Sequence, residues 1–204
     1  MVLGTATVMT VAADRTGMAQ RADLREAIRP GRGAVAGVAA YVVGYLVTYV
    51  LTSGPIRNSP ASQLVDLVSD GVATWKLVGW VFYSAQWVDV TVPGLLGGEN
   101  AVDLVTTFEA LPGYLRLIAP AALLLAGVAL GWRASSLGQG APRGAAAAIG
   151  YLPLAIVGAV LVGITIGDGG AGPDLVAAGA IGAGLALVLG AFGGTLAAAA
   201  TGGR

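Results

Sequence analysis

GAAAAIGYLPLAIVGAVLVGITI, residues 144–166, contains no charged residue and is long enough to cross a bilayer as a helix. A hydrocarbon core of about 30 Å needs about 20 apolar residues in a helix. A helix also satisfies the backbone polar groups of such a segment internally. Three further stretches meet the same demand, at residues 33–52, 111–132 and 175–199. The sequence therefore predicts an all-α membrane protein built as a four-transmembrane-helix bundle.

The composition agrees with lipid as the solvent and excludes several classes of function. Of the 204 residues, 56% are hydrophobic and only 11% are charged, and the eleven basic residues balance the eleven acidic ones. Without a net positive field, we expect no nucleic-acid partner. The chain has no cysteine and no histidine, so the commonest metal ligands and general base are missing. We therefore expect no enzyme, catalytic residue, metal or cofactor.

The distribution of positive charge predicts which side of the membrane each connection occupies. With four spans and a cytoplasmic N-terminus, the inner side holds Arg15, Arg21, Arg25, Arg29, Arg32, Arg133, Arg143 and Arg204, and the outer side holds Arg57, Lys76 and Arg116. Cytoplasmic loops of membrane proteins carry such an excess of Lys and Arg. We therefore expect a multi-pass cell-membrane protein with both termini cytoplasmic, a cytoplasmic segment at 1–32 and an external segment at 54–110.

The external segment contains a fifth apolar stretch, at residues 72–92, which is interrupted by Lys76, Gln86 and Asp89. If it crossed the membrane, every later connection would change sides, against the positive-inside tendency. We expect a short helix that rests at headgroup depth or caps the bundle, preceded by another short helix near 64–72. The aromatic residues and the lysine of this stretch form a candidate external cap: Trp75, Lys76, Trp80, Tyr83 and Trp87.

The connections between the last three spans are short and polar. Residues 133–143 include two arginines and a glutamine, and residues 168–174 include three glycines, a proline and two aspartates. Such compositions are typical of tight turns between antiparallel helices.

The first span carries a candidate polar stripe formed by Tyr41, Tyr45, Thr48 and Tyr49. Such a stripe could line a polar path. Tyrosines at this spacing are more often packing residues whose hydroxyls bond to neighbouring helices, and we favour that interpretation. Gly33 with Gly37, Gly163 with Gly167, and Gly190 with Gly194 have the spacing that lets two helix backbones approach closely. That spacing serves dimerisation or packing within one chain, and we favour packing.

Four acidic residues lie near the end of the aromatic stretch or beyond it: Asp89, Glu99, Asp103 and Glu109. Their spacing fits neither a calcium loop nor a pair of catalytic carboxylates. We therefore expect them to form a solvated acidic face.

The run TWKLVGWVFYSAQ (residues 74–86), followed by YLRLI (residues 114–118), resembles an uncharacterised family of haloarchaeal multi-pass membrane proteins, sometimes labelled transporters. The resemblance covers most residues after Met18, which competes with Met1 as the start of the chain. It implies a helical membrane bundle and brings no established activity.

These observations lead to two hypotheses of function. The first is a non-enzymatic structural or interaction protein whose external aromatic and acidic cap meets membrane lipid, a solute or another membrane protein. The alternative is a small transporter or channel subunit that works as a homo-oligomer and uses the polar stripe of the first span.

Overall fold

The structure is a computed structural model that describes residues 30–57, 74–94, 98–107, 111–134, 136–166 and 169–201. Within these residues, four helical segments are long and apolar enough to cross a membrane. They are Pro30–Arg57, Gly113–Gly131, Leu137–Val162 and Leu175–Thr201. Several predicted features lie outside the described residues: the segment 1–29 with both possible start methionines, the helix expected near 64–72, Gly167, Glu109 and Arg204.

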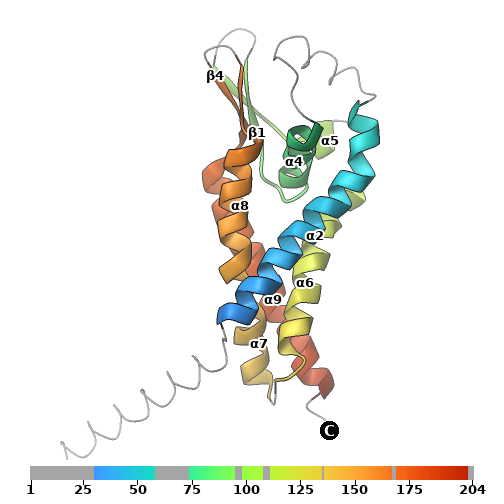
Figure 1. Cartoon of the computed structure of the whole chain (residues 1–204), viewed down its shortest axis with the longest axis vertical. Helices are drawn as coiled ribbons and strands as arrows, with labels where there is room; N and C mark the ends of the chain where they lie inside the picture. The colour runs from blue at the N-terminus through green and yellow to red at the C-terminus, as the bar shows by residue number, and fades with distance from the viewer. Residues whose placement is uncertain are drawn as a thin grey trace, which may run out of the picture.

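The helices run alongside one another as a bundle (Figure 1). Two of the four segments consist of more than one element, because a 3-10 turn η1 precedes α6, and α7 leads into α8. The helix bounds are α2 (Pro30–Arg57), η1 (Gly113–Leu117), α6 (Ile118–Gly131), α7 (Leu137–Ala145), α8 (Ala148–Val162) and α9 (Leu175–Thr201). Two short helices, α4 (Thr74–Ser84) and α5 (Leu104–Thr107), lie outside this set.

A small sheet corrects the expectation of an all-α fold. Its four strands are antiparallel neighbours in the order β2-β1-β4-β3. The strands are β1 (Val90–Pro93), β2 (Glu99–Val102), β3 (Ile164–Ile166) and β4 (Gly169–Pro173). Thus the connection between α8 and α9, expected to be a tight turn, forms the β3–β4 pair and joins the sheet of the external segment.

The helix that contains most of the third predicted span, 144–166, has different bounds at both ends. The helical segment begins at Leu137, and α8 ends at Val162, where Gly163 takes an extended conformation with ψ 148°. Ile164, Thr165 and Ile166 are β-branched or apolar residues that suit a strand, and hydropathy alone does not separate them from the preceding helix. At the other end, the segment expected to be a turn forms α7, in which Arg143 donates to Gln139 Oε1 at 3.0 Å and to Arg133 O at 2.6 Å.

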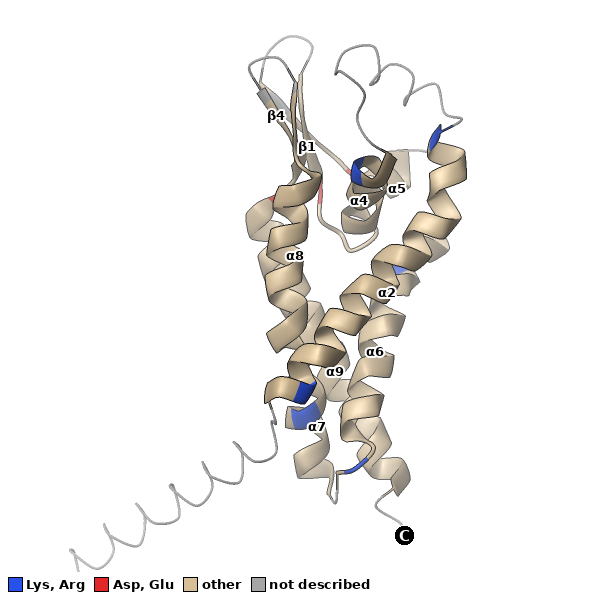
Figure 2. Ribbon diagram, in the orientation of Figure 1, with Lys and Arg blue, Asp and Glu red and all other residues tan. Residues whose placement is uncertain are grey.

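The two ends of the bundle differ in what they carry. The sheet, α4 and α5 lie together at one end, whereas α7, the start of α2 and the end of α9 lie at the other (Figure 1). Basic positions mark the α7 end in Figure 2. There, Arg143 donates a hydrogen bond to the backbone carbonyl of Arg133. Arg32 lies at the same end, because the next residue, Gly33, packs against Ala146 at the end of α7.

The helices pack through small residues and turn large apolar residues outward. A Cβ added at Gly190 of α9 would lie 2.5 Å from Gly144 O of α7, and one added at Gly194 would lie still closer to Gly140 O of α7. The same two α9 glycines also contact α6, opposite Gly127 and Gly131. Large side chains such as Val35 and Val176 are 70% and 81% exposed. Gly190 and Gly194 therefore serve packing within the chain.

We expect Gly190→Val to destabilise the fold by about 1–3 kcal/mol, because the added methyl groups would overlap the α7 backbone. Gly184→Val is the matched control on the same helix, since nothing lies within 4 Å of a Cβ at Gly184. Thermal unfolding of the purified protein in mild detergent measures the difference. Equal shifts for the two variants would contradict the packing described here.

Candidate functional site

The aromatic stretch forms a short buried helix between α2 and α8. Helix α4 has 11 residues and is about 16 Å long, too short to cross a bilayer. All residues from Val78 to Ser84 are buried. Figure 1 shows α4 in the space between α2 and α8, at the end of the bundle that carries the sheet. Hence α4 is inserted into the protein and does not rest on its surface.

Three side chains of α4 bond to backbone carbonyls of α8 and the residue after it. Lys76 Nζ donates to Gly163 O and Trp80 Nε1 to Val162 O, each at 2.9 Å, and Tyr83 OH donates to Ala155 O at 2.5 Å. The last carbonyls of a helix have no partner within that helix. Lys76 and Trp80 therefore complete the hydrogen bonding of the end of α8, and α4 runs antiparallel to it.

The bundle interior at α4 contains a buried set of phenol and carboxamide groups. Tyr41 OH and Tyr83 OH are 2.9 Å apart, and Tyr151 OH donates to Gln86 Oε1 at 2.5 Å. Gln86 Nε2 in turn donates to Phe82 O at 3.2 Å. Burial raises the pKa of the Tyr83 phenol above its ordinary value, which keeps it a neutral donor. These groups satisfy one another, as buried polar groups must.

The five residues of the predicted external cap do not share one environment. Trp80 and Tyr83 are 5% and 1% exposed, whereas Trp75 and Trp87 are 41% and 49% exposed. Trp87 leaves the helical face shared by Lys76, Trp80 and Tyr83, because α4 ends at Ser84 and Trp87 adopts a positive φ of 60° in the following turn.

The four residues of the predicted polar stripe also separate. Tyr41 faces Tyr83, and Tyr45 OH donates to Trp75 O at 2.8 Å. Thr48 Oγ1 donates to Gly44 O within its own helix at 2.9 Å. Tyr49 OH accepts from Arg57 at 3.5 Å. Each hydroxyl thus has a protein partner, the arrangement expected of packing residues.

The acids of the predicted solvated face have different roles in the described structure. Asp103 forms an ion pair with Arg116, and its Oδ1 accepts from Val105 N at 3.0 Å at the start of α5. The Arg116 guanidinium also lies 5.8 Å from the Trp87 ring. Asp89 is exposed. Among the residues that the structure describes, no group of three or more acidic side chains is placed to hold a metal ion.

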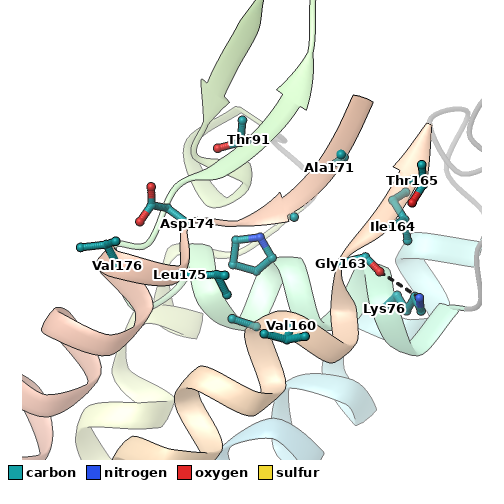
Figure 3. Close-up of a pocket in the computed structure, with 14 residues that line it drawn as sticks. Lys76, Thr91, Val160, Gly163, Ile164, Thr165, Ala171, Asp174, Leu175 and Val176 are labelled. Atoms are coloured by element: carbon teal, nitrogen blue, oxygen red, sulfur yellow. Dashed lines mark hydrogen bonds between the residues drawn. The ribbon is translucent and has the colours of Figure 1, made fainter. Parts of the chain in front are cut away.

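A groove lies where the sheet meets the end of α8 and the start of α9 (Figure 3). Its volume is about 810 Å³. It is lined by Lys76, Thr91, Ala159, Val160, Gly163, Ile164, Thr165, Gly170, Ala171, Gly172, Pro173, Asp174, Leu175 and Val176. Asp174 Oδ1 accepts from Ala177 N at 2.6 Å and so caps the start of α9.

Sequence reasoning missed the partnership of Gln86 with Tyr151, as well as the groove. Gln86 stood out only as an interruption of an apolar stretch, and Tyr151 was not singled out. The groove depends on the unpredicted sheet, so no local signal could indicate it. Lys76 was singled out as a residue of the candidate external cap, but its position in the lining of the groove was not predicted.

The model of a family described as "Family of unknown function (DUF7978)" matches residues 12–201. No curated protein and no solved structure matches the chain.

We expect Tyr83→Phe to lower the free energy of unfolding by about 1–2 kcal/mol, because it removes the bonds to Tyr41 and Ala155 O. Tyr114→Phe is the matched control, since Tyr114 is 56% exposed. Thermal unfolding in detergent compares the two variants with the parent protein. A Tyr83→Phe variant as stable as the control would contradict an anchoring role for the phenol.

Proposed function

The chain belongs to this family of unknown function, and we propose that it is a non-enzymatic integral membrane protein that presents a rigid external cap to a partner. We define the cap as α4, α5 and the four-stranded sheet. The observation that carries the proposal is the pairing of β1 with β4, in which Val90 lies opposite Pro173 and Thr91 opposite Gly172. This pairing joins the external segment to the connection between α8 and α9.

Membrane integration is supported by the distribution of side chains. The four long helices bury glycine and alanine and expose valine and leucine. In water this arrangement would leave a large apolar surface exposed. In lipid it is favourable, because small residues permit close backbone contact while the outer side chains meet acyl chains.

The proposed orientation places the α7 end in the cytoplasm. Arg32, Arg133 and Arg143 lie at that end, and the arginine-bearing segment 1–29 leads into α2 there. The positive-inside tendency then assigns the cap to the outer surface and both termini to the cytoplasm.

The interaction role is supported by how firmly the cap is attached. Asp174 N donates to Asp89 O at 3.1 Å, which extends the junction beyond the β1–β4 pair. The three α4 anchors on α8 add a second attachment. A surface held in one geometry loses little conformational entropy on binding. An oligomeric transporter or channel subunit stays a prediction, and the polar stripe it would use has its hydroxyls bonded to protein atoms.

Single-cysteine labelling tests the topology in this naturally cysteine-free chain. We expect an impermeant thiol reagent, applied to intact cells, to label Asn100→Cys and Gly170→Cys but not Gly138→Cys, because only the first two lie on the cap side. All three positions are exposed, so labelling after permeabilisation controls for reactivity. Labelling at position 138 in intact cells would overturn the orientation.

Site-specific photo-crosslinking in native membranes tests the interaction role. We expect a photoreactive residue at Asn100 or Trp75 of the cap to give discrete protein adducts, since both are exposed. Val188 of α9, 67% exposed on the bundle, is the matched position and should give lipid adducts. Protein adducts from Val188 but none from the cap would argue that the bundle, rather than the cap, meets the partner.

A further inference from the structure

We propose that the groove beneath the β3–β4 pair binds the phosphate group of a membrane lipid, with the Lys76 ammonium as its cationic partner. This inference rests on the proposed membrane integration and names a ligand for the base of the cap. The groove lies where the candidate spans α8 and α9 end and the sheet begins (Figure 3). In a bilayer that level corresponds to the headgroup region.

The shape of the groove suits a headgroup. Its volume of about 810 Å³ falls within the range of about 300–1,000 Å³ typical of small-molecule sites. Small residues supply much of the lining, including Ala159, Gly163, Ala171 and Gly172. A Cβ at Gly172 would lie 3.1 Å from the Gly163 Cα, so the β4 strand and the end of α8 are already in close contact there.

Lys76 has unused capacity for an anion. Its ammonium group carries three donors, and the bond to Gly163 O uses one of them. The centroid of the Trp75 ring lies 5.6 Å from Nζ, within the range of a cation–π contact. Within the described ranges the one ion pair joins Arg116 to Asp103, so no described carboxylate neutralises Lys76.

Two hydroxyl groups and one carboxylate complete the polar lining. Thr91 and Thr165 offer hydroxyl donors to phosphate oxygens. Asp174 is also in the lining, but its carboxylate accepts from Ala177 N and lies at the start of α9, where the helix dipole offsets its charge. Lys76 is therefore the one cationic side chain of the lining, and the single carboxylate is already engaged at the start of α9, which favours an anionic group beside Lys76.

The apolar part of the lining favours a lipid over free phosphate. Val160 of α8 and Leu175 and Val176 of α9 are 59%, 49% and 81% exposed. They belong both to the groove and to the apolar outer surface of two candidate spans. A lipid whose phosphate meets Lys76 can continue along this surface with its acyl chains, whereas inorganic phosphate gains nothing from it.

Protection of Lys76 from acylation tests the site directly. Lys76 is the sole lysine of the sequence, so peptide mass spectrometry reports one side-chain amine. The full-length protein in non-ionic detergent is treated with an amine-reactive ester in the presence of short-chain phosphatidylglycerol, diacylglycerol of the same chain length, or inorganic phosphate. We expect the phospholipid alone to slow the acylation about tenfold.

Each other outcome of that experiment overturns the proposal. No protection by the phospholipid means that the groove does not bind it. Equal protection by inorganic phosphate indicates a free-anion site, and equal protection by diacylglycerol indicates an apolar site without phosphate recognition.

Variants separate recognition by Lys76 from its anchoring of α4. We expect Lys76→Gln to weaken binding of a fluorescent phospholipid about tenfold, and Lys76→Arg to retain most of the affinity. Trp80→Phe removes the neighbouring hydrogen bond from α4 to Val162 O. Because Trp80 does not line the groove, the affinity of this variant for the phospholipid should equal that of the parent protein. Wild-type affinity in Lys76→Gln, or an equal loss in Trp80→Phe, would assign Lys76 a structural role only.

A filled groove gives an independent test. Gly170 lines the groove and has nothing within 4 Å of an added Cβ, so Gly170→Trp should occupy the space without disturbing the backbone and abolish the protection of Lys76. Gly184→Trp, equally open but outside the groove, should leave protection intact. Protection that survives Gly170→Trp would place the lipid elsewhere.

Alkaline extraction and the cysteine labelling distinguish this inference from the proposed function. A protein that resists extraction and shows the expected sidedness, but whose Lys76 is not protected, refutes the lipid site alone. A protein released from membranes by alkali refutes the proposed membrane integration.

Discussion

The architecture depends on close backbone contact between helices at glycine. Gly190 and Gly194 of α9 meet glycines of both α6 and α7 at distances that leave no room for a Cβ. In the proposed bilayer, apolar surface is no reason for helices to associate, because lipid is equally apolar. Dispersion between tightly apposed backbones then supplies the attraction. The outward valines and leucines need only remain apolar, which explains why the spans look alike in sequence.

Helix α4 solves a different packing problem at the other end of the bundle. There, α2 and α8 are separated by α4 (Figure 1), and large aromatic side chains replace glycine contacts. Trp80, Phe82 and Tyr83 join Tyr41 and Tyr151 in one buried cluster, with the Tyr41 and Phe82 ring centroids 5.3 Å apart and nearly perpendicular. The hydrogen bonds fix the register of α4 against α8, and the rings fill the volume. The sheet and the groove lie at this same end of the bundle.

The sequence predicted what local hydropathy determines and missed what distant segments determine together. Four apolar helices could be recognised because each span carries its own signal. The sheet could not, because β1 pairs with a glycine-rich strand that follows a transmembrane pattern, and Ile164 to Ile166 read as the end of a helix. Tyr41 and Lys76 were singled out by type and spacing. Their partners Tyr83 and Gly163 O lie 42 and 87 residues away, beyond any periodic pattern.

The anchoring of α4 on α8 has a consequence for the order in which the protein is assembled. The carbonyls that receive Lys76, Trp80 and Tyr83 lie 87, 82 and 72 residues later in the chain. Helix α4 is therefore synthesised well before the carbonyls of α8 and Gly163 to which it binds. During that interval α4 can pack against α2, but Lys76, Trp80 and Tyr83 lack the carbonyls to which they donate. The end of the bundle that carries the sheet can therefore assemble only after α8 and the strands that follow it have been synthesised.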